Sequence, residues 1–332
     1  MAATAQEEEP TSPTSTLSQT CMNMSALEVP FVISQGYSDV VAFNSGSQGT
    51  LYSASQRSSG RQVVLKRIPK SVAIKRVRLE IEAGIRLRGV QGIPHFHESF
   101  DQSDCTWLVF DRADGIDLLT FMENSDFEPT PENVVRHIAT HVIRILSKVH
   151  QAGFAHKDLK LENIMYNPKT KYVWLIDFGL SYNMKKEPNC KDFAGSKEYA
   201  SPEMLLSRNT FCPKKVDVWA LGVTFYALLF GMFPFPHDEQ SEGKMHKTKR
   251  HPRLTFPESS VSKEATDLLG RMICTDATHR MEASQLLSHA WFAAGKGRGP
   301  RGGQSQREIH LYHQAGIAVL RPNCIYEAGQ LQ

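Results

Sequence analysis

The sequence of 332 residues lacks the features that mark several classes of protein. Its six cysteines lie far apart, with no Cys-x-x-Cys pair and no zinc-like cysteine and histidine spacing, so we expect reduced thiols. The 38 lysines and arginines against 35 acidic residues leave a net charge of +3, too small to predict nucleic acid or an anionic membrane as the main partner. What is present, 41% hydrophobic and 22% charged residues, is typical of a globular protein with a packed core.

Targeting signals are also missing from the N-terminal end. The first ten residues are acidic where a signal peptide is basic and apolar, and Ala2 stands where myristoylation requires glycine, so we expect a cytoplasmic protein. The apolar run Val218–Phe235 is long enough to raise the question of a membrane span. It has no flanking anchors and ends in prolines, so we predict a buried helix and no membrane partner. We interpret the basic segment Gly243–Arg253 as a solvated loop, with docking of acidic segments or nuclear import as alternatives.

The chain divides into a strand-rich part and a helix-rich part. Residues 1–37 begin with a stretch rich in Glu, Ser, Thr and Pro, and we predict a disordered tail there. A helix is predicted at about 72–88, among short strands at Val40–Phe43, Thr50–Ser53, Val63–Lys66 and Thr106–Phe110. From Asp117 onward the spacing becomes helical, and Thr130 is expected as N-cap with Pro131 at the first helical position. Residues 293–332 are interpreted as a flexible basic linker and tail.

Two short segments carry side chains suited to phosphoryl transfer: Ala155–Asn163, which contains His-Lys-Asp-Leu-Lys, and the later Asp177-Phe-Gly. Transfer from ATP needs a carboxylate that orients the incoming hydroxyl and accepts its proton, oxygen ligands for magnesium, and cations across the phosphates. Asp158 fits the base, and Asn163 and Asp177 fit the metal ligands. Upstream, Lys66 ends a predicted strand where its ammonium can reach the phosphates, and Asn44–Leu51 supplies a loop to cover the nucleotide.

With these motifs, residues 38–292 resemble the eukaryotic protein kinase family. Ala194–Glu203 is similar to the substrate-binding loop of that family, and Asp217–Gly222 is similar to the start of its buried central helix. The resemblance implies an α+β, two-lobed fold. A small antiparallel β lobe with one helix would span residues 38–112, and a larger, mainly α lobe would span residues 113–292. It also implies ATP and Mg²⁺ as cofactors in the cleft between the lobes.

The resemblance assigns roles to single residues. Lys66 is expected to pair with a glutamate of the small-lobe helix, and we choose Glu80, with Glu82 as the competitor, because Leu87 then falls on the core face. Lys160 is similar to the lysine that steadies the γ-phosphate in Ser/Thr-specific members, with Ser196 in support. Arg280 is expected to pair with Glu203. The residues expected at the nucleotide are Asn44, Gly46, Gly49, Leu51, Val64, Lys66, Phe110, Asp111, Ala113, Asp117 and Met165.

Within that set, the resemblance places Phe110 behind the adenine, Leu51, Val64 and Met165 around the base, and backbone donors at Asp111 to Ala113. The expected partners are proteins with Ser or Thr acceptors. Asp117 and Glu162 match positions that receive a basic side chain, so we predict a preference for Arg three residues before the acceptor.

Three residues depart from the family pattern. Asn44 replaces the first loop glycine, which is tolerable because asparagine visits left-handed conformations readily. Lys157 replaces the usual arginine, and we predict that it forms with Asp192 a built-in substitute for a phosphorylated switch; two solvated charges are the alternative. Gly84 stands where the family packs an apolar side chain. It predicts a loosely held helix that needs a tail or partner to place Glu80, and a higher basal activity for Gly84→Leu.

The sequence therefore predicts a serine/threonine protein kinase. Lys66, Asp158, Asn163 and Asp177 would carry the chemistry. One alternative is a pseudokinase scaffold that acts through partners, which Asn44 and Gly84 keep open. The other is a small-molecule kinase, which should lack the substrate loop.

Overall fold

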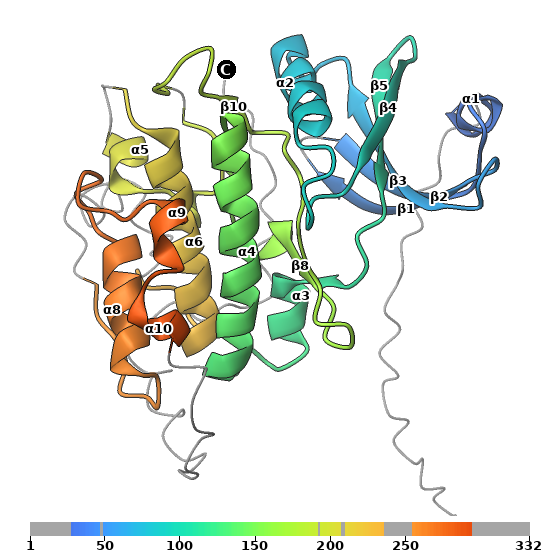
Figure 1. Cartoon of the computed structure of the whole chain (residues 1–332). Coiled ribbons are helices and arrows are strands. Elements are labelled where there is room, and N and C mark those ends of the chain that lie inside the picture. Colours follow the sequence, from blue (N-terminus) through green and yellow to red (C-terminus); the bar gives the residue numbers. More distant parts are fainter. Residues whose placement is uncertain (1–27, 47–48, 192, 207–209, 236–253, 294–332) are drawn as a thin grey trace, which may run out of the picture.

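The computed structural model describes residues 28–46, 49–191, 193–206, 210–235 and 254–293. Figure 1 shows a small lobe built on a β-sheet beside a larger lobe built of helices. The predicted α+β, two-lobed fold is therefore confirmed. The segments 243–253 and 294–332, for which the sequence predicts a basic loop and a linker with a tail, lie outside the described residues.

The small lobe is a five-stranded antiparallel sheet in the order β1-β2-β3-β5-β4. Its strands are β1 (Tyr37–Gly46), β2 (Gly49–Gln56), β3 (Gln62–Pro69), β4 (Phe96–Asp101) and β5 (Cys105–Asp111). Successive side chains of β3 point to opposite faces, so Val63 and Leu65 join a core cluster around Trp107. Lys66 and Ile68 follow in the same strand and are also buried. Ile68 packs in a second cluster with Val77 of the helix α2.

The helix α2 (Ile74–Arg86) is slightly shorter than the predicted 72–88. Val77, Glu80 and Ala83 are buried, at a spacing of three residues that keeps them on one face of the helix. Leu87, just after the helix, is 1% exposed, as expected for the core face.

Two features of the small lobe differ from the sequence predictions. Strand β4 was not predicted, because its polar sequence Phe-His-Glu-Ser-Phe-Asp shows little hydrophobic alternation. The helix α1 (Glu28–Ser34) lies within the range predicted as a disordered tail. Its Val32 is fully buried and its Phe31 ring lies 5.7 Å from that of Phe100, so the tail prediction was too long at its C-terminal end.

The large lobe begins where the chain leaves β5. Its strands are β6 (Ile116–Asp117), β7 (Phe154–Ala155), β8 (Ile164–Tyr166), β9 (Val173–Leu175) and β10 (Tyr182–Asn183). Its α-helices are α3 (Leu118–Glu123), α4 (Glu132–Ala152), α5 (Pro202–Leu206), α6 (Pro213–Phe230), α8 (Lys263–Met272), α9 (Ala283–Leu286) and α10 (Ala290–Ala293). Two short 3₁₀ helices, η1 (Leu161–Asn163) and η2 (Lys197–Tyr199), lie in the loops that form the site. The two-stranded sheet of β7 and β10 and the sheet β6-β8-β9 flank those loops.

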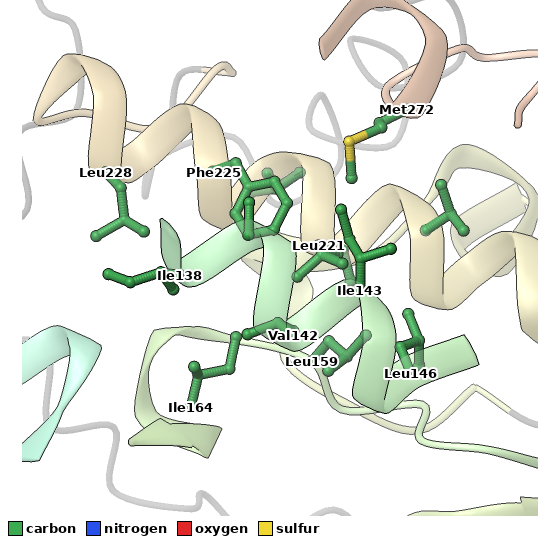
Figure 2. Packing of buried hydrophobic residues seen from close by; sticks show 14 of the residues in the cluster. Ile138, Val142, Ile143, Leu146, Leu159, Ile164, Leu221, Phe225, Leu228 and Met272 are labelled. Atoms are coloured by element: carbon green, nitrogen blue, oxygen red, sulfur yellow. The ribbon is translucent and has the colours of Figure 1, made fainter. Parts of the chain in front are cut away.

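The core of the large lobe forms where α4 and α6 pack together. Figure 2 shows Val142, Ile143 and Leu146 of α4 beside Leu221 and Phe225 of α6, all buried. Nearly all of α6 is buried around its whole circumference, which explains why its sequence contains a continuous apolar run. In the described part of the chain, none of the helices combines the length and the hydrophobicity that a membrane crossing requires.

The start of α4 differs by one residue from the prediction. Pro131 occupies the N-cap and Glu132 is the first helical residue, so Thr130 is not the cap. The Thr130 hydroxyl is buried without a hydrogen-bond partner among the described residues, which a capping role would have prevented. The helix ends at Gly153, whose φ of 91° gives the left-handed conformation common at helix ends.

Candidate active site

The two lobes meet at a buried lysine. The Lys66 ammonium on β3 lies 2.6 Å from Glu80 Oε1 on α2 and 2.7 Å from Asp177 Oδ1 of the Asp-Phe-Gly segment. The pair expected with Glu80 therefore forms, and the competitor Glu82 contacts other residues. Two carboxylates from separate elements thus converge on one ammonium, each within hydrogen-bond distance of it.

Their electrostatics favour the ionised forms. Burial alone lowers the pKa of Lys66, but the carboxylates of Glu80 and Asp177 reverse this effect and raise it. Burial raises the pKa of Asp177, and Lys66 together with the Gly179 N–H outweighs it, so that pKa falls below its usual range. Burial also pushes the pKa of Glu80 upward, against the attraction of Lys66. The Lys66 ammonium lies only 2.6 Å from Glu80 Oε1, the distance of a charge-assisted hydrogen bond, which favours the ionised pair over the neutral one.

The segment Ala155–Asn163, called the catalytic loop below, brings a second group of polar side chains together around Asp158. The Lys160 ammonium lies 3.3 Å from Asp158 Oδ2 and donates a hydrogen bond of 3.1 Å to the Ser196 hydroxyl. The Asn163 amide donates to the Asp158 carbonyl at 2.7 Å and to its carboxylate at 3.1 Å. Asp158 and Glu162 raise the pKa of Lys160, against the lowering effect of its burial. Asp158 is thereby oriented by one amide and one ammonium.

A buried aspartate holds this loop in place. Asp217 at the start of α6 is fully buried and accepts hydrogen bonds from the backbone N–H groups of His156, at 2.9 Å, and of Lys157, at 2.8 Å. The ring of His150 on α4 lies 2.8 Å from the same carboxylate. The central helix α6 therefore fixes the backbone immediately before Asp158.

Backbone conformation at the site is unusual at two non-glycine residues. Lys157 has a φ of 66° and Asp177 a φ of 60°, the left-handed region that costs free energy for residues with a Cβ. Such strain persists only where the surroundings enforce it, as Asp217 does beside Lys157. Gly195 has a φ of 121°, and a Cβ there would lie 2.8 Å from the Lys157 carbonyl oxygen. The substrate loop can therefore approach the catalytic loop only through a glycine.

A cavity of about 690 Å³ opens beside these groups. It is lined by Asp158, Lys160 and Ser196, by Val77 and Glu80 of α2, and by parts of the segment that follows Asp177. The expected base therefore faces open space rather than packed interior, which an incoming hydroxyl requires.

Three of the residues expected around the adenine lie on adjacent strands of the small lobe, and Met165 lies in the large lobe. Leu51 on β2 is the cross-strand partner of Lys66, and Val64 is the partner of Phe110 on β5. Met165 on β8 pairs with Asp117 on β6 in the large lobe. Leu51, Val64, Phe110 and Met165 are all half-buried. The register therefore brings Leu51 and Val64 close to Lys66.

The backbone after β5 refines the hinge prediction. The Asp111 N–H donates to the His95 carbonyl at 2.9 Å and is already used. Within the described chain, the Ala113 N–H takes part in no backbone hydrogen bond and remains as a donor. The Asp111 side chain lies 2.7 Å from His97 and 3.3 Å from Arg61, so it stabilises the strand edge.

The nucleotide-covering loop is the hairpin between β1 and β2, where Gly46 pairs with Gly49. Gly49 has a φ of 137°, and a Cβ there would lie 2.1 Å from the Arg67 carbonyl oxygen, so a glycine is required. Asn44 lies in β1 opposite Leu51 and is not among the residues with positive φ. The reason given for its tolerance, a left-handed conformation, was therefore wrong; extended backbone accepts asparagine without strain.

The interpretation of Gly84 also needs correction. A Cβ on Gly84 would lie 2.8 Å from both Cβ and Cγ of Phe96 on β4, so the space is filled by this ring. The helix α2 is formed, with Glu80 on Lys66, and the need for a tail or partner to place Glu80 stays a prediction. Gly84→Leu would overpack this contact rather than fill a gap.

The remaining sequence predictions concern Asp117, Arg280 and Lys157. Asp117 caps α3, accepting from the Thr120 N–H at 2.9 Å and from its hydroxyl at 2.8 Å. Arg280 contacts both oxygens of Glu203 at 2.7 and 3.1 Å, as expected. The Lys157 ammonium donates to the Cys190 sulfur at 3.1 Å, while Asp192 lies outside the described residues, so that pairing stays a prediction.

The donor set fits magnesium bound with nucleotide phosphates. Asp177 uses Oδ1 for Lys66 and Gly179, and Asn163 uses its amide nitrogen for Asp158, which leaves an oxygen on each residue for a hard cation. No group of three or more candidate metal-ligating side chains occurs in the described ranges. Mg²⁺ typically takes one or two protein carboxylates and completes its shell with phosphate and water, so this donor set fits it.

Two residues of the site were not singled out by the sequence for what they do here. Asp217 was assigned only to the start of a buried helix; an isolated aspartate in a long apolar run was the signal for a buried acceptor. Glu82 was weighed only as a rival of Glu80. It contacts Asn183 and Lys186, which no local sequence pattern indicates.

Known proteins have sequences similar to that of this chain. A CDPK-related kinase 5 of Arabidopsis thaliana is 31% identical over 240 residues, which cover 70% of this chain and 39% of that protein. A serine/threonine-protein kinase PEPKR2 of the same plant is 31% identical over 249 residues, 74% of this chain and 51% of its own. The chain thus spans about half the length, or less, of these relatives. The model of the protein kinase domain matches residues 37–292, and the chain belongs to the protein kinase domain family.

Proposed function

We propose that this chain is a serine/threonine protein kinase that transfers the γ-phosphate of ATP to hydroxyl groups of protein substrates. The observation that carries this proposal is the joint presence of the Lys66–Glu80–Asp177 cluster and an Asp158 carboxylate open to a cavity. A scaffold that only bound partners would need neither group. The names of the relatives and the family match support the same activity class.

The roles follow from the geometry. Asp158 orients the acceptor hydroxyl and takes its proton, while Asn163 and Lys160 hold the carboxylate in position. Lys66, kept charged by two carboxylates, is placed to contact the phosphates. Bound Mg²⁺ would be held by Asp177 and Asn163 and would neutralise charge on the transferred phosphate. Lys160 and Ser196 are positioned to steady the same group from the acceptor side.

The substrate preference is proposed to be an arginine three residues before the acceptor. Glu162 supports this choice because its carboxyl oxygen Oε2 is buried and has no hydrogen-bond partner among the described residues. A buried acceptor without a donor is costly, and a guanidinium from a bound peptide would satisfy it. Asp117 is less suited, since both of its oxygens are used to cap α3.

The test is a radiolabel transfer assay with magnesium, ATP and a degenerate peptide library, comparing the unmodified chain with Asp158→Asn. Loss of the general base should lower kcat by a factor of roughly 10² to 10⁴ while ATP binding persists. Binding of nucleotide without transfer by the unmodified chain would instead favour the scaffold. A library profile without selection for arginine three residues before the acceptor would refute the substrate preference alone.

A further inference from the structure

The helix α2 carries a second acidic residue that faces the large lobe. Glu82 Oε1 accepts a hydrogen bond of 2.9 Å from the Asn183 amide, and Glu82 Oε2 lies 2.8 Å from the Lys186 ammonium. Each carboxylate oxygen therefore has its own donor. Both donors belong to the segment that follows Asp-Phe-Gly, about a hundred residues away in the sequence.

The far end of this contact is firmly anchored. Asn183 is 7% exposed and pairs with Phe154 in the two-stranded sheet of β10 and β7. The next residue, Met184, donates its N–H to the Gly153 carbonyl at 2.8 Å, at the end of α4. The Asn183 amide oxygen accepts from the Lys185 N–H at 2.9 Å, which leaves the amide nitrogen directed at Glu82. Glu82 thus binds to the frame of the large lobe.

The first half of the helix has little support of its own, so α2 relies on contacts of its second half, where Glu82 lies. Its C-terminal end is fixed to the small lobe, since Arg88 donates to the Phe96 and His97 carbonyls at 2.8 Å. Its N-terminus has no side-chain cap, and its first turn contains no acidic residue. Three exposed cations, Lys75, Arg76 and Arg78, lie in this half, where the helix dipole disfavours positive charge.

We propose that Glu82 is a positioning residue, a strut that holds α2 against the large lobe so that Glu80 stays on Lys66. This inference rests on the proposed kinase function. It gives α2 a support within the chain itself, where the sequence predicts support from a tail or partner. Of the two contacts, the one with Asn183 contributes more to holding α2. The Lys186 side chain is 65% exposed, so its attraction to Glu82 is weakened by water and salt.

The first experiment compares Glu82→Ala and Glu82→Gln with Glu264→Gln, an exposed glutamate on α8 as the control. Glu82→Ala should lower peptide kcat/KM about tenfold, the loss expected for a charge-assisted hydrogen bond. Glu82→Gln, which keeps an acceptor for Asn183, should lose only about two- to threefold, and the control nothing. Wild-type activity in both Glu82 variants would overturn the proposal.

A double-mutant cycle tests whether Glu82 acts through Glu80. In a Glu80→Ala background, Glu82→Ala should change the remaining activity by less than about twofold, because the pair it supports is already gone. An undiminished tenfold loss in that background would refute a positioning role. Charge exchange gives a second check: Glu82→Lys with Lys186→Glu should recover activity relative to Glu82→Lys alone, which a general loss of stability would not allow.

Hydrogen exchange separates this inference from the proposed function. Backbone amides of α2 should exchange faster in Glu82→Ala than in the unmodified chain, while those of α6 stay unchanged. This readout needs no phosphotransfer. If the unmodified chain transfers no phosphate but the α2 amides still exchange faster in Glu82→Ala, the proposed function is refuted and the positioning role of Glu82 is supported. Unchanged exchange in α2 would overturn the strut whatever the activity.

Discussion

The two lobes hold their halves of the active site by different means. In the large lobe, the loop that carries Asp158 is fixed by a fully buried aspartate, Asp217, at the start of the buried helix α6. In the small lobe, Glu80 depends on α2, which starts without a cap and packs against β4 through a glycine. The base is therefore preorganised, whereas the glutamate that holds Lys66 is adjustable. Control of the proposed activity would act more easily on α2 than on the catalytic loop.

The largest effect should come from removing the large-lobe anchor. Asp217→Ala would leave the backbone N–H groups of His156 and Lys157 buried without acceptors. At about 1–3 kcal/mol for each unsatisfied buried group, the free energy of unfolding should fall by about 3 kcal/mol or more, measured by urea titration. Asp217→Asn, which keeps one acceptor oxygen, should lose less. Equal stability of Asp217→Ala and the unmodified chain would contradict the contrast between the lobes.

The next effect concerns the contact of α2 with β4. Gly84→Leu should lower the free energy of unfolding by about 1–3 kcal/mol and lower activity, because the new side chain meets the Phe96 ring. Thermal unfolding and the peptide assay report both changes. The double variant Gly84→Leu with Phe96→Ala should regain part of the loss, since the ring no longer fills the space. A rise in basal activity of the single variant would restore the view of α2 as loosely packed here.

A smaller effect of opposite sign is expected at Glu162. Burial raises the pKa of its carboxyl, against the attraction of Lys160, so the ionised form is the costly one in the folded protein. Glu162→Gln should raise the free energy of unfolding by about 1 kcal/mol near pH 8 while weakening selection for arginine.

The pH dependence follows from the same shift. The penalty of ionised Glu162 is full above the raised folded pKa, and it disappears as the pH falls through that value to below the unfolded pKa of about 4.3. The advantage of Glu162→Gln should therefore shrink on acidification, as thermal unfolding at several pH values would measure. An advantage that grew toward low pH would have the wrong sign.

The smallest effect is expected at Asp117. Asp117→Asn keeps an oxygen for the Thr120 N–H and should change stability by only a few tenths of a kcal/mol, whereas Asp117→Ala should cost about 1 kcal/mol through loss of the α3 cap. Peptide profiling should show that Asp117→Asn keeps the arginine preference that Glu162→Gln loses. The reverse result would assign the substrate contact to Asp117.

Much of the site could be predicted because the residues proposed to carry its chemistry lie in short segments of the sequence. Asp158, Lys160 and Asn163 lie within six residues of one another, so their grouping needs only a local turn. The pairing of Lys66 with Glu80 and not Glu82 could be chosen because the helical period puts Glu80 on the same face as Val77 and Ala83. The errors at Thr130 and in the tail prediction arose where local preference gave way to packing, as with Val32 against the sheet.

The sequence by itself determined the two-part organisation, the order of the motifs and the identity of the charged groups, because these depend on periodicity and on neighbouring residues. Only the tertiary structure decided what surrounds them: that Phe96 fills the place beside Gly84, and that Asp217 holds the catalytic loop. It also decided that Glu82 reaches Asn183. These contacts join segments that are 12 to 101 residues apart in the sequence. Their geometry is fixed by how distant elements pack, which no local pattern indicates.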